Sequence, residues 1–246
     1  MRDRTVVVLA ARINSRRLPR KMLLPINRRP LIEMLIRRLK RSKEVDEIVL
    51  ATTRATYPHV RDVIERMGIS FFIGSETDVL GRYYRAAKRA HAGIVVRATG
   101  DNPLVSPEAI DMIVRYHRRH HPDLSHYLGL PLGTGVEVIS FPALARAHRE
   151  AKDAFSREHI TQHMYRNRDR YSVREPRAPR RFCRDDLSLT VDTENDYRTV
   201  SRIFRHFGAD SESVGVDRII RYVERTERSL IERRYYKRID NMRVLC

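Results

Sequence analysis

The chain lacks the features that mark secreted and membrane-spanning proteins. Its two cysteines, Cys183 and Cys246, lie far apart and do not have the spacing of metal ligands. No apolar run reaches the roughly 18 residues that a transmembrane helix needs. The first apolar run, residues 5–11, is short and leads into a charged segment, so it predicts a first strand and not a secretory signal. We therefore expect a reduced, cytoplasmic protein without a membrane partner.

Lysine is also scarce, although the chain is strongly basic. Only six of the 49 basic residues are lysine, and the formal net charge is +18. A charge of this size often indicates nucleic-acid binding, but the 43 arginines are spread along the whole chain and form no tail or block. We therefore interpret the excess as a solvated basic surface, and we do not expect nucleic-acid binding as the main role. Such a surface would still attract an anionic substrate, for example a nucleotide.

The first 120 residues alternate short apolar runs with amphipathic stretches, which is typical of a parallel sheet flanked by helices. Beyond residue 120 the alternation is looser, and we found no internal repeat or low-complexity linker. One α/β domain with a β-rich insertion in its second half is the simplest interpretation. The predicted strands are 5–11, 47–53, 69–73, 93–98, 124–128, 136–141 and 187–191; the predicted helices are 30–41, 58–67, 78–91, one that Ser106 caps, 142–151, 156–167, 194–207 and helices within 217–234.

Three segments follow the ends of predicted strands, where the loops of a parallel sheet converge on bound ligands. The first, residues 10–21, is rich in basic residues. Arg12 can contact a phosphate with two N–H groups, Ser15 can donate from its hydroxyl, and Lys21 adds a point charge. The Gly-Lys-Ser/Thr ending of a Walker loop is absent. The segment predicts a polyphosphate-binding loop, although an exposed basic loop could have the same composition.

The other two segments, 97–103 and 190–196, each bring an aspartate to a strand end. One or two such carboxylates, with phosphate oxygens and water, typically hold Mg²⁺ on a nucleotide. Asp101 could instead only cap its turn, and Thr193 with Asp196 could form the capping box of the next helix. Capping does not explain Asp192. A second acid that reaches the same sheet edge as Asp101 and the basic loop would complete a metal site.

Taken together, the three segments resemble the cytidylyltransferases that activate ulosonic and nonulosonic acids. The basic loop is similar to their A-R-x-x-S-x-R-L-P-x-K pattern, and the Gly-Asp-Asn-Pro and Val-Asp-Thr turns match their metal-binding turns. The register is most similar to the spore-coat polysaccharide cytidylyltransferase branch. Supporting stretches are 47–53, 74–84, 135–141 and 157–161, and the match runs in order from residue 5 to residue 207.

The resemblance implies a fold and a set of residue roles. The fold would be a three-layer α/β/α, Rossmann-like, nucleotide-diphospho-sugar transferase-like mixed sheet with a small β-rich excursion. Residues 1–246 would be one domain, with a nucleotide-binding half (1–120), an acceptor-binding half that includes the metal strand (121–210) and C-terminal helices (211–246). The implied catalytic residues are Arg12, Lys21 and Asp101; the CTP contacts are Ala11, Arg12, Ser15, Arg17, Lys21, Ser75, Asp78, Arg82 and Thr99; the acceptor contacts are Glu137, Glu158 and His159; and the Mg²⁺ ligands are Asp101 and Asp192.

The sequence departs from the family pattern at three places. Asn14 stands where glycine is usual, which is tolerable because asparagine enters left-handed conformations readily. Arg20 replaces a second usual glycine and could add a cation to the phosphates. His126 and Tyr127 occupy a position where a small polar pair is common, which leaves the acceptor open.

Other histidines have simpler interpretations. We expect His117, His120 and His121 to be solvated at the end of a basic helix. His159 and His163 have the spacing of a helical metal pair, but no third ligand is evident, and we expect a packed or acceptor-contacting His159.

The expected reaction is transfer of CMP from CTP to a sugar acid or related polysaccharide precursor, with release of pyrophosphate, in cell-surface glycan biosynthesis. The acceptor oxygen could be an anomeric hydroxyl, which yields a CMP-sugar, or a phosphate, which yields a CDP-linked product. One alternative is a nucleotidyltransferase of the same fold that uses another nucleoside triphosphate and a phosphate or sugar-phosphate acceptor. A second is a non-catalytic nucleic-acid or polyanion binder. The expected partners are CTP, a small anionic sugar-like acceptor and a second copy of the chain in a homodimer.

Overall fold

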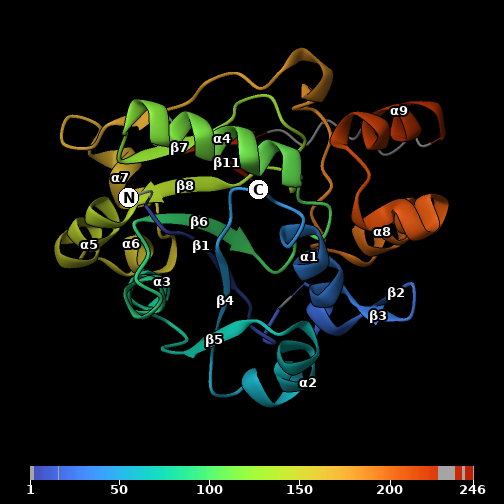
Figure 1. The fold of residues 1–246 in the computed structure, drawn as a ribbon, viewed down its shortest axis with the longest axis horizontal. Coiled ribbons are helices and arrows are strands. Elements are labelled where there is room, and N and C mark those ends of the chain that lie inside the picture. Colours follow the sequence, from blue (N-terminus) through green and yellow to red (C-terminus); the bar gives the residue numbers. More distant parts are fainter. Residues whose placement is uncertain (1–2, 16, 227–235, 240–241, 246) are drawn as a thin grey trace.

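A single seven-stranded sheet forms the centre of the molecule in the computed structural model (Figure 1). The structure describes residues 3–15 and 17–226, together with the backbone of 236–239 and 242–245. The strand order is β5-β4-β1-β6-β8-β7-β9. Only β8 runs against its neighbours β6 and β7, so the expected mixed, mostly parallel sheet is confirmed. The strands are β1 (Thr5–Ala10), β4 (Glu47–Thr52), β5 (Ser70–Ile73), β6 (Ile94–Thr99), β7 (Leu124–His126), β8 (Glu137–Ser140) and β9 (Val173–Arg174).

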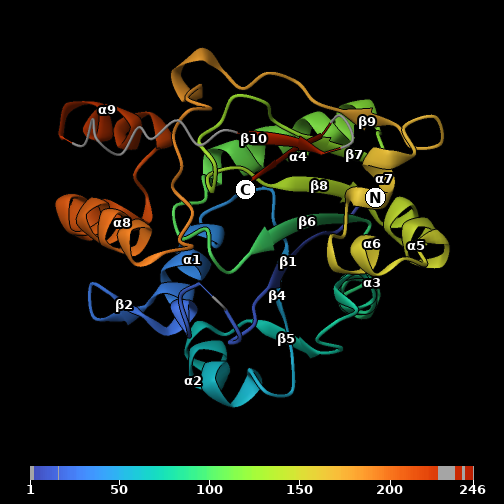
Figure 2. The ribbon, with the colours of Figure 1, turned by 180° about the vertical axis from the view of Figure 1, so that it is seen from behind.

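Helices cover both faces of this sheet, because alternate residues of its strands are apolar on opposite sides. On β1, Val7 and Leu9 pack into one core, whereas Val6 and Val8 pack into the other. Figure 2 shows α3 and α5 on the opposite side of the sheet from α1 and α2. The three-layer α/β/α architecture is therefore confirmed. The first core is covered by α1 (Leu31–Leu39), α2 (Tyr57–Met67) and α4 (Pro107–His120), and the second by α3 (Val79–Arg89), α5 (Phe141–Glu150) and α7 (Gln162–Arg166). The short helix α6 (Ala154–Glu158) lies against α3 and α7.

A third core joins the C-terminal helices to the N-terminal part of the chain. The helices α8 (Glu194–Phe207) and α9 (Val216–Thr226) lie side by side at one end of the molecule (Figure 1). Arg38 of α1 is fully buried and donates to the carbonyls of Val105, Ser211 and Val214 at 2.8, 2.6 and 3.0 Å. This side chain therefore ties α1 to the segment that connects α8 and α9. The short elements around this core are η1 (Lys21–Leu23), β2 (Pro25–Ile26), β3 (Arg29–Pro30), η2 (Arg180–Phe182) and η3 (Gly208–Glu212).

Several element boundaries differ from the expectation. The predicted helix 156–167 is two helices, because the chain turns at His159, buries Ile160 and directs the Thr161 hydroxyl to Glu137. The predicted strand 187–191 is wrong: this extended segment bonds to loops, through Leu132 and Asp101, and only an isolated bridge forms at Ser188. The hairpins β2–β3 and β10–β11, the latter formed by β10 (Tyr236–Ile239) and β11 (Met242–Leu245), were not anticipated.

The helix α9 is described as far as Thr226, and residues 227–234 of the helical region predicted at 217–234 lie outside the described part of the chain. Across the part that is described, no helix has the length and apolarity to cross a bilayer. The division of the chain into a nucleotide-binding half (1–120) and an acceptor-binding half (121–210) stays a prediction.

His117 corrects another expectation. It is not solvated: only 2 % of it is exposed, and its Nδ1 lies 2.9 Å from the Ser125 hydroxyl. Burial lowers the pKa of His117 to about 4. Its spacing from Ile110, Ile113 and Val114 puts it on the apolar face of α4. This spacing is the sequence feature that indicates burial, although charged residues surround His117 in the sequence. His120 and His121 are exposed as expected.

Candidate active site

The three segments predicted to converge do meet, and Lys21 is their common contact. Its Nζ lies 3.2 Å from Asp101 Oδ2, 2.8 Å from Asp192 Oδ1 and 2.8 Å from the carbonyl oxygen of Val191. The basic loop follows β1, Asp101 follows β6, and Asp192 follows the extended segment that replaces the predicted strand. A cation and two carboxylates from distant parts of the chain thus form one cluster at the carboxyl edge of the sheet.

The basic loop is shaped by bonds to the loop after β4. The amide of Ile13 donates to Thr56 Oγ1 at 3.0 Å, and Thr52 Oγ1 donates to the Ala11 carbonyl at 3.1 Å. The amide of Ser15 donates to the Ile13 carbonyl at 2.9 Å, which closes a tight turn. These bonds hold the first part of the loop, while the side chain of Arg12 stays exposed.

The two replaced glycines behave differently. Arg20 adopts a left-handed conformation, with φ 55° and ψ 23°, which explains why glycine is usual at this position. Asn14 is not among the residues with positive φ. Its side-chain amide donates to Glu76 Oε1 at 2.8 Å. The expectation of a left-handed backbone at Asn14 is therefore wrong. Arg20, directly before Lys21, does adopt the left-handed conformation.

Backbone packing brings the two acids together. The amide of Gly100 donates to the Ala10 carbonyl at 2.9 Å, and a Cβ at this position would lie 3.3 Å from that oxygen, so β6 passes close to β1. The Asp101 carbonyl then accepts from the amide of Val191 at 2.8 Å, which aligns the segment that carries Asp192 with the end of β6. The side-chain amide of Asn102 closes the turn by donating from Nδ2 to Thr99 Oγ1 at 2.9 Å.

The capping box of α8 is confirmed. Thr193 Oγ1 accepts from the Asp196 amide at 3.3 Å, and Asp196 Oδ2 accepts from the amides of Thr193 and Asp192 at 2.8 and 3.0 Å. These contacts leave the Asp192 carboxylate to contact cations. Besides Lys21, Arg17 reaches it, with Nη2 3.0 Å from Oδ2.

The donors of this cluster suit a hard divalent cation. Within residues 3–15 and 17–226, no group of three or more His, Cys, Asp or Glu side chains could hold a metal ion. Asp101 and Asp192 offer two carboxylates, which is the number that Mg²⁺ commonly takes from protein when phosphate and water complete its shell. The residues present therefore fit a cation that is shared with a polyphosphate, and not a closed all-protein metal site.

The predicted nucleotide contacts at 75–82 have structural partners. Asp78 caps α3, because its Oδ1 accepts from the Gly81 amide at 2.8 Å, and its Oδ2 pairs with Arg157 at 2.6 Å. Arg82 is buried and donates to the Ser75 carbonyl, while Ser75 Oγ accepts from the Asp78 amide at 3.0 Å. Burial, together with the charge of Arg12, lowers the pKa of Arg82. The three residues shape a turn near Arg12, and direct contact with a nucleotide stays a prediction.

On the predicted acceptor side, Glu158 and His159 are both exposed. Glu158 Oε1 lies 3.4 Å from Nη2 of Arg12, so this segment reaches the basic loop. The His159 ring packs against Phe155, with ring centroids 4.5 Å apart. Both side chains are therefore accessible, and Glu158 lies beside Arg12.

Glu137, in contrast, lies inside a hydrogen-bond network. Its oxygens accept from Arg97 at 2.7 Å, Thr161 at 3.1 Å and Tyr165 at 2.9 Å. Burial would raise the pKa of Glu137, but the charges of Arg97 and His126 hold it below its ordinary value. Glu137 is therefore an ionised residue whose oxygens are already engaged.

The sequence reasoning missed the partners of Glu137. Strand register puts Arg97 of β6, Glu137 of β8 and His126 of β7 directly opposite one another. Tyr165 bridges the last two, with its hydroxyl 2.9 Å from His126 Nδ1. The charged Arg97 within an otherwise apolar strand was the available signal. These residues form one polar row across three strands on the side of α6 and α7.

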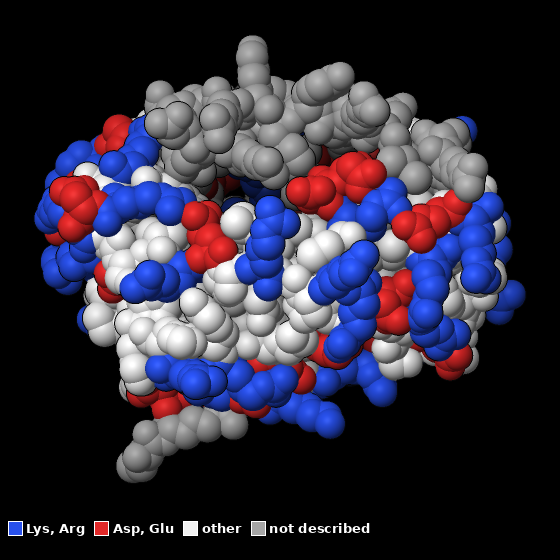
Figure 3. All heavy atoms as spheres, turned by 90° about the horizontal axis from the view of Figure 1, so that it is seen from above, with Lys and Arg blue, Asp and Glu red and all other residues white. Residues whose placement is uncertain are grey.

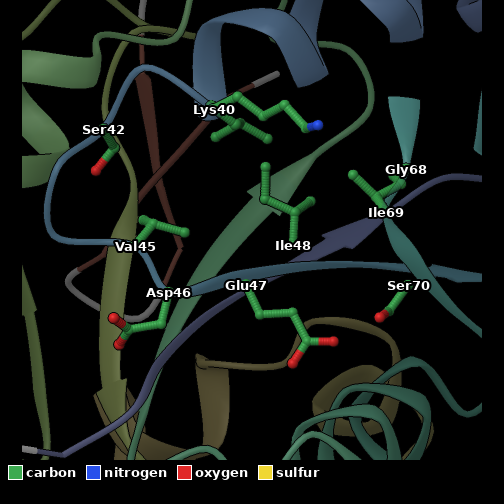
Figure 4. A pocket seen from close by; sticks show the side chains of 10 residues that line it. Lys40, Ser42, Val45, Asp46, Glu47, Ile48, Gly68, Ile69 and Ser70 are labelled. Atoms are coloured by element: carbon green, nitrogen blue, oxygen red, sulfur yellow. The ribbon is translucent and has the colours of Figure 1, made fainter. Parts of the chain in front are cut away.

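A hollow of about 290 Å³ lies elsewhere, at the beginnings of β4 and β5 (Figure 4). Its polar side chains already have partners: Lys40 donates to the Met67 carbonyl, and Asp46 accepts from the Thr5 amide at 2.7 Å. Because it lies at the amino ends of these strands, it is at the opposite edge of the sheet from the cluster around Lys21. It is not part of the candidate site.

The charged surface shows no separate basic face in the view of Figure 3, where acidic and basic side chains alternate. Many arginines are paired, for example Arg146 with Asp123 at 3.1 Å and Arg184 with Asp186 at 2.7 Å. This distribution agrees with a solvated basic surface.

Comparison with known proteins gives both sequence and structural relatives. MJ1063 of Methanocaldococcus jannaschii, described as an uncharacterized protein, is 36% identical over 219 residues, 89% of each chain. The spore coat polysaccharide biosynthesis protein SpsF of Bacillus subtilis is 30% identical over 235 residues, which cover 92% of this chain and 96% of SpsF.

Among solved structures, a cytidylyltransferase from Leptospira borgpetersenii aligns with a TM-score of 0.86 at 24% identity and covers 96% of this chain and 100% of that one. The CMP:2-keto-3-deoxy-manno-octonic acid synthetase complexed with CTP aligns with a TM-score of 0.65 at 16% identity, over 82% and 99% of the two chains. At these identities the two structures support the fold. The family model described as cytidylyltransferase matches residues 6–233, and the chain belongs to the cytidylyltransferase family.

Proposed function

We propose that this chain transfers CMP from CTP to a sugar acid or a related polysaccharide precursor, with release of pyrophosphate, in cell-surface glycan biosynthesis. The observation that carries the proposal is the contact of Lys21 with both Asp101 and Asp192 at the carboxyl edge of the sheet. Membership of the family supports CTP as the donor. The likeness to the synthetase that was solved with CTP supports a sugar-acid acceptor, and the likeness to SpsF supports a role in polysaccharide biosynthesis.

The triphosphate would lie against the basic loop. Arg12 and Arg17 are largely exposed and pair with acidic side chains across the site, Glu158 and Asp192 respectively. Both can therefore turn toward phosphate oxygens, where a guanidinium makes two parallel hydrogen bonds. Lys21 and the Ser15 hydroxyl would complete the phosphate contacts, with Ala11 and Thr99 next to them.

Mg²⁺ is the divalent cation that we propose for the carboxylates of Asp101 and Asp192. When bound, it would supply positive charge to the phosphate oxygens during the transfer. This proposal follows from the two hard carboxylate donors and from the room that they leave for phosphate and water.

The reaction needs no covalent enzyme intermediate. An acceptor hydroxyl releases its proton to water as its oxygen forms a bond to the α-phosphorus of CTP. The bond from that phosphorus to the bridging oxygen breaks, and pyrophosphate leaves. Arg12 and Lys21 stabilise the negative charge that develops on the departing pyrophosphate. Glu158 and His159, beside Arg12, would contact the acceptor. Glu137 would act on the acceptor through Arg97 and Thr161, because its own oxygens are occupied.

Pyrophosphate release tests the proposal. Each of the four nucleoside triphosphates is assayed with Mg²⁺ and with a panel of sugar acids that includes 2-keto-3-deoxy-manno-octonic acid. We expect turnover with CTP and an acidic sugar. Turnover with another triphosphate and a sugar phosphate would instead support a different nucleotidyltransferase of the same fold. Salt-dependent RNA binding without any nucleotide turnover would contradict the proposal that the chain is an enzyme.

Two further properties belong to the same proposal. The enzyme would work in the cytoplasm, where CTP is made, and it would form a homodimer. Light scattering after size-exclusion chromatography gives the molar mass in solution, and a mass of 29.0 kDa, that of one chain, would contradict the homodimer.

A further inference from the structure

We infer that Lys21 keeps a free divalent cation off Asp101 and Asp192 until CTP binds and can bring the cation with it. The inference deepens the proposed function and rests on it. The side chain of Lys21 occupies the carboxylate oxygens that a cation would need.

The ammonium group of Lys21 has no donor to spare. It carries three N–H groups, and three acceptors surround it: Asp101 Oδ2, Asp192 Oδ1 and the Val191 carbonyl. The group is also shielded, since its side chain is 14% exposed and those of Asp101 and Asp192 are 29% and 18% exposed. Lys21 is therefore held where its charge is neutralised and its hydrogen bonds are satisfied.

A free divalent cation would have to displace this ammonium group. The displaced Lys21 would lose all three hydrogen bonds, and removing the partners of a shielded charge is costly. If it stayed, two positive groups would share the same carboxylates at short range, which is also unfavourable. Both routes weaken binding of the free cation.

A bound triphosphate removes this penalty. Its phosphate oxygens offer Lys21 new acceptors within the same loop, so the ammonium group can leave the acids without losing its partners. Arg17 can exchange in the same way, because it pairs with Asp192 and is exposed. The cation that arrives on the nucleotide then balances Asp101 and Asp192, and the basic side chains balance the phosphates.

Binding of Mn²⁺, measured by the electron paramagnetic resonance signal of the free ion, tests the inference without turnover. We expect wild type to bind Mn²⁺ weakly alone and much more tightly when CTP is present. Lys21→Met should bind Mn²⁺ without CTP at least about tenfold more tightly than wild type, a change of roughly 1.4 kcal/mol. Equal or weaker binding by Lys21→Met would overturn the inference.

Two matched variants separate occupancy of the site from general charge. Lys43→Met removes the same charge from an exposed lysine just before β4, whose beginning lies at the opposite edge of the sheet from Lys21. This variant should bind Mn²⁺ like wild type. Arg17→Met removes a charge that also touches Asp192 and should tighten binding less than Lys21→Met. An equal gain in Lys43→Met would mean that the general positive field acts and not the position of Lys21. An equal gain in Arg17→Met would mean that any cation paired with Asp192 excludes the metal as well as Lys21 does. Either result would overturn the specific role of Lys21.

A measurement on the wild-type chain covers the case in which Lys21→Met does not fold. Only six lysines are present, so the ¹⁵N resonance of the hydrogen-bonded Lys21 ammonium group can be assigned. Mg²⁺ alone should leave this resonance in place, and Mg²⁺ with CTP should shift it; a shift with Mg²⁺ alone would overturn the inference. If the wild-type protein does not turn over CTP at all, the proposed function is wrong. If it does turn over CTP but Lys21→Met binds Mn²⁺ no more tightly than wild type, only the inference about Lys21 is wrong.

Discussion

Arg97 and Glu137 face each other across β6 and β8, with Nη1 and Oε2 2.7 Å apart. The same carboxylate accepts from Thr161 and Tyr165, so it anchors the segment that carries Glu158 to the sheet. The predicted acceptor contact Glu137 is thus the centre of a partly buried network, and a substitution there should act on both stability and acceptor binding.

Glu137→Gln should lower the free energy of unfolding by about 2 kcal/mol, because Arg97 loses its counter-charge and the new amide group faces hydroxyl donors. Urea unfolding measures this change, and Glu65→Gln, an exposed partner of Arg61, is the control, with a loss below about 1 kcal/mol. The KM for the acceptor should rise more than the KM for CTP. Stability like that of the control would contradict the anchoring role.

Asp101→Asn should reduce kcat by at least about a hundredfold, because a neutral amide holds a divalent cation poorly and one preorganised charge is lost. Pyrophosphate release measures kcat, and thermal unfolding checks that the fold is intact. Asp62→Asn on the exposed face of α2 supplies the control. Full activity in Asp101→Asn would remove this residue from the cation site.

Arg20→Gly should stabilise the chain by about 0.5–1 kcal/mol. A left-handed non-glycine residue costs roughly 1–2 kcal/mol, and the greater freedom of glycine in the unfolded chain offsets only part of this gain. Urea unfolding measures the change in the free energy of unfolding. Arg41→Gly is the control: because the φ of Arg41 is not positive, this substitution should destabilise the chain. A loss of stability in Arg20→Gly would show that the arginine side chain has a compensating contact.

Stability should fall in acid because of His117. Burial lowers the pKa of this imidazole from 6.5 to about 4, so between these values the unfolded chain binds more protons than the folded one. The free energy of unfolding therefore decreases as the pH falls from about 6.5 to about 4, by roughly 3 kcal/mol from this group.

Urea unfolding at pH 7.5 and pH 4.5 measures the effect. His117→Gln should lose much of the difference between the two pH values, and the exposed His120→Gln should keep it. Equal pH dependence in both variants would assign the acid sensitivity to other groups.

Local features of this fold could be predicted from the sequence because they depend on neighbouring residues. Short, nearly continuous apolar runs predicted β1, β4 and β6, because the side chains on both faces of a covered sheet must be buried. The cap at Ser106 and the capping box of Thr193 and Asp196 also formed as expected, because such bonds span three residues. The loop and its two acids could be found because ligand sites gather at strand ends.

The tertiary structure alone decided which groups meet. Lys21 lies 80 and 171 residues from the two acids that it contacts, and no periodicity records such a pairing. The reversal of β8, the burial of His117 and the row of Arg97, Glu137 and His126 depend in the same way on strand register and helix docking. Side-chain pattern encodes whether a residue is buried, whereas the partner that satisfies its charge is chosen only when distant segments pack together.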